Sequence, residues 1–91
     1  MNQLHAIVRG RVQMVGFRYF MIEEARRLGL TGWVRNGLNG TTVEVVAEGD
    51  ENALKQFERS LHVGPSGARV ETLDATWSDT LDGYYSFDVR G

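Results

Sequence analysis

The chain has 91 residues, 42% of them hydrophobic, with a formal net charge of −2 and no cysteine. These values are typical of one small globular domain, which we expect to span residues 1–91. The lack of cysteine excludes disulfides, thiolate-bound zinc, iron–sulfur clusters and a cysteine nucleophile, and the slightly acidic balance argues against nucleic acid or anionic lipid as a partner.

The first residues, Met1–His5, lack the basic and apolar tracts of a signal peptide. No apolar run approaches the ~20 residues that span a bilayer. We therefore expect a cytoplasmic protein with no membrane partner.

Periodicity predicts the elements of the first half of the chain. Alternating apolar residues predict a strand over about Leu4–Arg11, and from Phe17 helical spacing predicts a helix of about eleven residues that Gly29 ends. Thr31–Asn36 reads as a second strand, and the turn residues after it lead into a third strand, so that the two form a hairpin. The third strand is marked by Val43, Val45 and Ala47.

The second half predicts one more helix and further strands. Asp50 is the expected N-cap of a helix that Gly64-Pro65 ends, with a buried stripe of Ala53, Leu54, Phe57 and Leu61. Between Ala68 and Trp77 the alternation changes phase, which predicts a strand with a bulge near Glu71-Thr72. A last strand is marked by Tyr85, Phe87 and Val89.

The predicted order is β-α-β-β-α-β with one further strand-like piece. Two similar βαβ halves indicate an α+β, ferredoxin-like split-βαβ sandwich, in which both helices cover one face of an antiparallel sheet. Many unrelated functions share this architecture, so the fold alone names no activity.

The segment from Gly10 to Arg18 leaves the first strand and enters the first helix. Such a loop gathers unpaired backbone N–H groups at the positive end of the helix dipole, which suits a phosphate-sized anion. Arg18 faces that dipole unfavourably unless an anion lies between them. The loop has neither the G-x-x-x-x-G-K-[ST] pattern nor the full G-x-G-x-x-G pattern. These residues therefore fit either a small-anion site or a solvated surface arginine.

Asn36 should lie at the same end of the domain as Arg18. The helix from Arg18 to Leu28 travels about 15 Å, and the strand from Thr31 to Asn36 returns by roughly 16 to 17 Å. An amide there can hold a water molecule without acting as a base. The alternative is that Asn36 only begins the turn.

Other polar or aromatic residues are weaker candidates. His5 and His62 stand alone, without the spacing of metal ligands, so we expect solvated histidines and no metal site. The serines have no evident activating base. Trp33 and Trp77 fall on strands, where we expect them to pack or to lie on an exposed sheet face.

Two segments resemble the signatures of the acylphosphatases, which hydrolyse the mixed anhydride between a carboxylate and a phosphate. Gly10-Arg11-Val12-Gln13 with Val15-Gly16-Phe17-Arg18 resembles the phosphate-loop signature of that family. The second signature is similar to Leu30–Asn36, which Gly40 and Val43-Glu44-Val45 follow. The resemblance spans nearly the whole chain.

The resemblance implies a metal-independent, cofactor-free hydrolase that acts as a monomer on small-molecule acyl phosphates. Asn36 would orient the attacking water, and Arg18 would hold the phosphate together with backbone N–H groups of the loop. Those N–H groups belong to Gln13, Met14, Val15, Gly16 and Phe17.

The family usually has glycine where Met14 stands. A backbone with positive φ there would strain a methionine. We expect the Met14 N–H still to face the phosphate while the thioether covers the rim of the site, because Gly16 leaves the loop local freedom.

Two other functions remain open for this fold. One is a non-catalytic module that binds phosphate or a phosphorylated metabolite. The other is an RNA-binding domain, although the third strand, Thr42–Glu48, lacks the aromatic and basic residues that stack bases.

Overall fold

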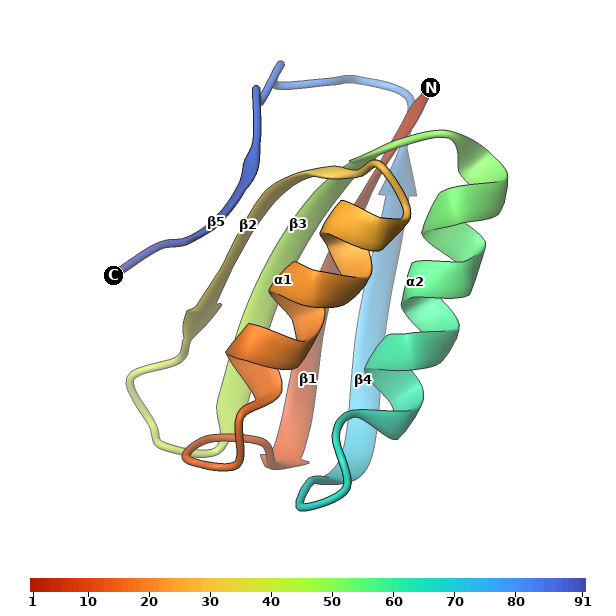
Figure 1. The fold of residues 1–91 in the computed structure, drawn as a ribbon. Helices are drawn as coiled ribbons and strands as arrows, with labels where there is room; N and C mark the ends of the chain where they lie inside the picture. Colours follow the sequence, from red (N-terminus) through yellow and green to blue (C-terminus); the bar gives the residue numbers. More distant parts are fainter.

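Two helices lie side by side on one face of a five-stranded sheet (Figure 1). The structure is a computed structural model that describes residues 1–91. No helix is long and apolar enough to cross a membrane. In chain order the elements are β1 (Asn2–Arg11), α1 (Phe17–Arg27), β2 (Thr31–Asn36), β3 (Thr42–Gly49), α2 (Glu51–Val63), β4 (Arg69–Ser78) and β5 (Phe87–Val89).

The predicted ferredoxin-like split-βαβ sandwich is confirmed, with one correction to its sheet. The strand order is β4-β1-β3-β2-β5, and the first four strands pair antiparallel. β5 instead pairs parallel with β2, because the chain crosses from β4 to the opposite edge before it enters the sheet (Figure 1). The sheet is therefore mixed at one edge.

The last strand is also shorter than predicted. β5 has three residues, and Tyr85 lies outside it with its side chain fully exposed. Residues 79–86 form the crossing segment between β4 and β5. This segment makes contacts of its own, including a hydrogen bond from the Trp33 Nε1 to the Tyr84 hydroxyl at 3.0 Å. Ladder pairing begins only after that segment, which leaves Tyr85 in solvent.

The core lies between the helices and the sheet, as the two periodicities require. Alternate residues of β1 and β3 point toward the helices and are buried, whereas α1 and α2 each bury one stripe. The buried cluster consists of Leu4, Ala6, Val8, Val12, Phe17, Met21, Ala25, Leu30, Val34, Val43, Val45, Ala47, Leu54, Phe57, Leu61 and Phe87.

The predicted element boundaries are met by specific local contacts. The Asp50 carboxylate accepts a hydrogen bond from the Asn52 N–H and caps α2. Gly29, with φ 72°, follows the end of α1, and the Leu30 N–H reaches back to the Ala25 carbonyl. The bulge in β4 is confirmed, because Arg9 pairs with Thr72 whereas the next residue pairs with Val70.

One buried carboxylate ties the crossing segment to the sheet. Glu48 is 3% exposed and accepts hydrogen bonds from the Asp82 and Gly83 N–H groups at 2.6 and 3.1 Å. The Gln3 side-chain amide also donates to it, at 2.7 Å. Burial acts to raise the pKa of Glu48, but these hydrogen bonds together outweigh burial and lower that pKa below its ordinary value.

Glu48→Gln is expected to lower the free energy of unfolding at pH 7 by about 1–3 kcal/mol, because a glutamine NH₂ group would face a backbone N–H donor. A depressed native pKa stabilises the fold above the unfolded-state pKa of about 4.3, and this stability is lost as the pH falls through the native value. The difference between variant and wild type should therefore shrink in acid. Urea unfolding at a series of pH values measures it.

Glu23→Gln is the matched control, since Glu23 is exposed on α1. That variant removes the same charge and should change the free energy of unfolding by less than about 0.5 kcal/mol. An equal loss in both variants would contradict the role given to Glu48.

Candidate active site

Residues 12–16 form a loop that leaves β1 and enters α1 at the lower end of the molecule in Figure 1. Within residues 13–17, φ is positive only at Met14 (62°) and Gly16 (78°), so the hand of the backbone alternates along the loop. This alternation turns successive N–H groups toward one side and forms a concavity that binds anions. The N–H groups from Gln13 to Gly16 donate to no backbone carbonyl. The loop thus presents free donors.

The start of α1 adds further donors. Gly16 is the N-cap of the helix, and no side chain caps the free N–H groups of the first turn. The first turn also contains no acidic residue. No protein side chain therefore compensates the positive end of the helix dipole, which is left to solvent.

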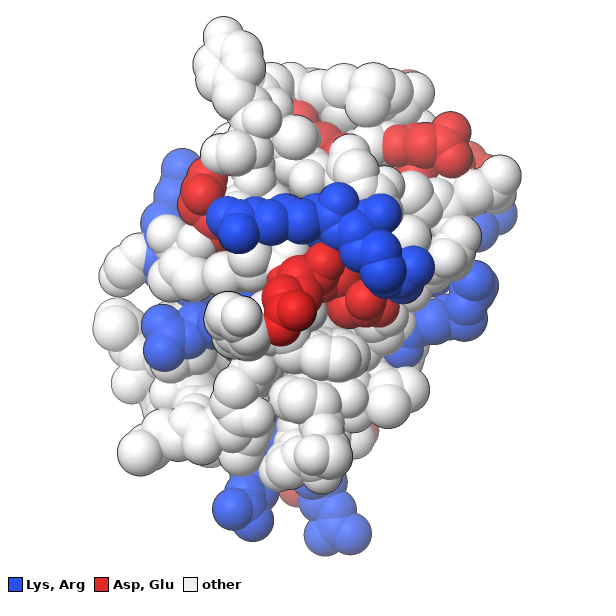
Figure 2. Space-filling view, in the orientation of Figure 1, with Lys and Arg blue, Asp and Glu red and all other residues white.

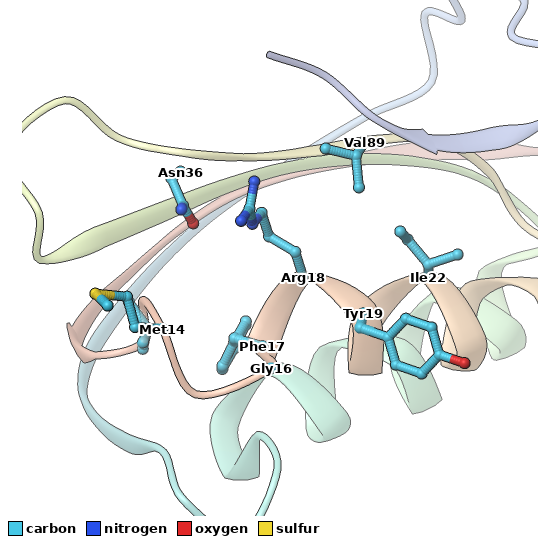
Figure 3. Close-up of a pocket in the computed structure, with 9 residues that line it drawn as sticks. Met14, Gly16, Phe17, Arg18, Tyr19, Ile22, Asn36 and Val89 are labelled. Atoms are coloured by element: carbon cyan, nitrogen blue, oxygen red, sulfur yellow. The ribbon is translucent and has the colours of Figure 1, made fainter.

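Arg18, the second residue of α1, is exposed and takes part in none of the five ion pairs of the structure. Figure 3 shows its side chain leaving the helix and bringing the guanidinium close to Asn36. A guanidinium carries its charge at all ordinary pH values and offers a planar fork of donors. Arg18 is thus a free cation directed into the space above the loop.

Asn36 is the last residue of β2, and its Oδ1 atom is buried without a hydrogen-bond partner. No other buried side-chain nitrogen or oxygen lacks a partner in this structure. An unsatisfied buried acceptor costs about 1–3 kcal/mol, so such an atom is retained where a ligand or solvent molecule can use it. Asn36 therefore contributes a free acceptor beside the free cation.

Arg18 and Asn36 line one cavity of about 290 Å³. They lie at the same end of the sheet, as the lengths of their elements predict. The other residues that line the cavity are Val12, Met14, Gly16, Phe17, Tyr19, Ile22 and Val89.

The Gln13 side chain joins the loop to the turn after Asn36. Its Nε2 atom donates to the carbonyls of Gly37 and Thr42, both at 2.9 Å. The turn is further closed by the side-chain Oδ1 of Asn39, which accepts from the Thr42 hydroxyl at 2.9 Å. The two segments that carry the loop donors and Asn36 are thereby fixed to each other.

Met14 has the left-handed backbone for which glycine is usually needed. Its side chain is 100% exposed at the rim of the cavity and blocks nothing beneath it (Figure 3). The structure therefore accommodates methionine at the cost of backbone strain, which for a residue other than glycine is about 1–2 kcal/mol.

The expectation of a solvated His5 is wrong. His5 lies half-buried on the sheet face opposite the helices, where its Nε2 is 2.6 Å from a Glu44 carboxylate oxygen. Arg35 donates to the other oxygen of Glu44 at 2.9 Å, so one carboxylate links β1, β3 and β2. Burial opposes ionisation of Glu44, but the hydrogen bonds from His5 and Arg35 outweigh it and lower the pKa of that carboxyl.

His62 is exposed near the end of α2, as expected. No group of three or more histidine, aspartate or glutamate side chains lies close enough together to hold a metal ion. Trp33 packs on the open sheet face, with the guanidinium groups of Arg35 and Arg90 5.1 and 4.7 Å from its ring centroid. None of these residues lines the cavity.

The charge around the candidate site differs from the charge of the whole chain. Figure 2 shows basic side chains projecting from the lower end of the molecule, whereas almost all acidic side chains visible in that view lie higher. Arg11 and Arg69 are register partners at this end of the sheet. A net charge of −2 is thus compatible with a locally positive end that attracts small anions.

Sequence reasoning missed four residues that line the cavity, Val12, Tyr19, Ile22 and Val89, and the supporting contacts of the Gln13 side chain. Ile22 follows Arg18 by one helical turn, and this i, i+4 spacing could have placed it beside the arginine. The position of Val89 at the cavity and the hydrogen bonds of the Gln13 side chain both join segments that are far apart in the sequence. No local pattern reveals such contacts. Tyr19 was passed over because it lies off the buried stripe of the helix.

Known proteins share both the sequence and the fold of this chain. A family model for acylphosphatase matches residues 4–89. An acylphosphatase from Salinibacter ruber is 49% identical over 89 residues, which cover 98% of this chain and 93% of the relative.

Solved structures agree with this match. A crystal structure of an acylphosphatase from Bacillus subtilis superposes with a TM-score of 0.96 at 43% identity, and all of each chain is covered. A structure of an acylphosphatase from Coxiella burnetii gives a TM-score of 0.90 at 35% identity over 98% of this chain and 92% of the other. The chain therefore belongs to the acylphosphatase family.

Proposed function

We propose that this acylphosphatase cleaves the carboxyl–phosphate bond of acyl phosphates by direct attack of water, with Arg18 and the loop amides on the phosphate and Asn36 on the water. The proposal rests on one observation. A guanidinium without an ion-pair partner and a buried acceptor without a hydrogen bond line one cavity, above a loop whose backbone N–H groups are unpaired. The phosphate is held by the backbone N–H groups of residues 13–17.

The donors match the charge that develops during phosphoryl transfer. Negative charge spreads over the three equatorial oxygens of the phosphoryl group, and fixed donors stabilise it without rearranging. The loop amides can reach oxygens on one side, while the Arg18 fork engages one or two others. These groups are in place before substrate binds, since the loop is fixed by Gln13.

Asn36 is suited to hold the nucleophile. Its free Oδ1 can accept a hydrogen bond from a water molecule and so direct the lone pair of that water toward phosphorus. Water then forms the new P–O bond, the carboxylate leaves with the electron pair of the old one, and one proton is released to solvent. Because a carboxylate is a good leaving group, the step needs alignment more than a strong base.

The proposal includes no metal and no cofactor. Arg18 supplies the positive charge that a divalent cation supplies in many phosphoryl-transfer sites. We further propose a cytoplasmic monomer, since one chain supplies every residue that lines the cavity. The comparisons do not favour the alternative of a non-catalytic phosphate-binding module.

Arg18→Ala is expected to lower kcat/KM for benzoyl phosphate by about 10²–10³, because it removes the main side-chain donor to the phosphoryl oxygens. Inhibition by inorganic phosphate should weaken in parallel. Arg59→Ala removes an exposed arginine from α2 and should leave both quantities unchanged. Full activity of Arg18→Ala would overturn the assigned role.

Asn36→Ala is expected to lower kcat by about 10²–10³ while phosphate inhibition stays within about twofold of wild type, since the amide holds water and not the phosphoryl group. Steady-state kinetics with benzoyl phosphate separate the two effects. Asn52→Ala, an exposed position on α2, is the control. Parallel losses of turnover and of phosphate inhibition would place Asn36 on the phosphate instead.

Metal independence predicts that a chelator leaves activity unchanged. The assay is hydrolysis of benzoyl phosphate by protein dialysed against EDTA, followed by addition of Mg²⁺ or Zn²⁺. Constant kcat/KM is expected throughout. A loss that either metal restores would contradict the mechanism.

Met14→Gly is expected to keep kcat/KM within about threefold of wild type, because the methionine side chain lies outside the cavity floor. Relief of backbone strain exceeds the extra unfolded-state entropy of glycine, so the free energy of unfolding should rise by about 0.5–1 kcal/mol. Gly16→Ala is the opposite case, since its added Cβ has open space but φ is 78°. It should destabilise the protein; stabilisation by Gly16→Ala would contradict the argument from strain.

A further inference from the structure

An apolar surface adjoins the phosphate side of the cavity. Six of its nine lining residues are hydrophobic, although phosphate and water need only polar partners. Ile22 of α1 and Val89 of β5 form part of this surface, and Val89 is 47% exposed. Tyr19 also lines the cavity and is 69% exposed.

The surface lies on a definite side of Arg18. In Figure 3 the guanidinium stands between Asn36 on one side and Val89 and Ile22 on the other. During in-line phosphoryl transfer the attacking and leaving oxygens lie on opposite sides of phosphorus. With the phosphoryl group bound at the guanidinium, between Asn36 and the apolar residues, attack by the water on Asn36 leaves the carboxylate and its acyl group on the side of Ile22 and Val89.

The charges of the lining residues restrict what the acyl group can carry. No aspartate or glutamate lines the cavity, so an ammonium group on the acyl portion would find no counter-charge. Arg18 is the single cation of the lining and is already assigned to the phosphoryl group. A second carboxylate or phosphate would also be unpaired there and would lose hydration on this apolar surface.

From this arrangement we infer that the Tyr19–Ile22–Val89 surface is an acyl-group subsite, which selects acyl phosphates whose acyl portion is uncharged and apolar, such as an aromatic ring or a branched chain. The inference rests on the function proposed above and names the substrate class of that site. Apolar contact lowers KM for such substrates, while the phosphoryl contacts are common to all acyl phosphates.

The test compares benzoyl phosphate with acetyl phosphate in wild type, Val89→Thr and the double variant Ile22→Thr/Val89→Thr. Threonine keeps the shape of valine but adds a hydroxyl to the surface. We expect the double variant to lose about tenfold in kcat/KM for benzoyl phosphate, mainly through KM, and less than twofold for acetyl phosphate. Val63→Thr, at an exposed position on α2, should change neither value.

The same enzymes are also assayed with succinyl phosphate, whose acyl group carries a second carboxylate. For wild type, kcat/KM divided by the rate constant of uncatalysed hydrolysis should be no higher for succinyl phosphate than for acetyl phosphate. A higher kcat/KM for succinyl phosphate would overturn the inference, as would equal losses for benzoyl and acetyl phosphate in the variants.

The outcomes separate this inference from the proposed function. If wild type hydrolyses none of the three substrates, the proposed function fails. If it hydrolyses them but the threonine variants leave benzoyl phosphate unaffected, only the acyl subsite fails. Circular dichroism checks folding, and Val89→Thr alone decides the matter if the double variant does not fold, with an expected loss of about threefold for benzoyl phosphate alone.

Discussion

The arrangement of the site depends on one side-chain amide. Gln13 belongs to the loop after β1, yet its two hydrogen bonds end on Gly37 and Thr42, on either side of the turn between β2 and β3. Each bond contributes only about 0.5–1.5 kcal/mol to stability. Their larger effect is geometric, because they fix the loop amides relative to the end of β2. Arg18 and Asn36 lie on different elements, and a shift of about 1 Å between those elements would misalign a phosphoryl group and its attacking water.

Packing supports this clamp from below. Phe17, the first residue of α1, is 1% exposed, and its ring lies so close to Gly64 that a Cβ there would come within 2.7 Å of it. The end of α2 thus holds the start of α1 in place, and with it the free N–H groups that follow Gly16. Strain at Met14 can persist because the segments on both sides of the loop are anchored in this way. The strained backbone of Met14 therefore lies between segments that packing and hydrogen bonds hold rigid.

Most elements could be predicted from the sequence because their apolar periods agree with the final burial, and the Asp50 cap and the β4 bulge followed from local chemistry. The lengths of the first helix and the second strand alone predicted that Arg18 and Asn36 lie at the same end of the domain. The parallel pairing of β5 could not be predicted in this way, since it depends on where the crossing segment binds the sheet. The partner of His5 was missed for the same reason: Glu44 is 39 residues away and meets it only across two paired strands.

The two faces of β2 carry different groups, an ion network on one and a proposed catalytic residue on the other. Arg35 points to the open face and joins the ion network of Glu44 and His5, whereas Asn36, the next residue, lines the cavity on the helix side. All the groups that we propose for catalysis, the loop amides, a guanidinium and a carboxamide, keep one protonation state across the physiological range. The titratable network of His5, Arg35 and Glu44 lies on the other face of the sheet, and none of its members lines the cavity. A site built from fixed dipoles and one permanent charge is suited to a substrate whose carboxylate leaves without the help of an acid.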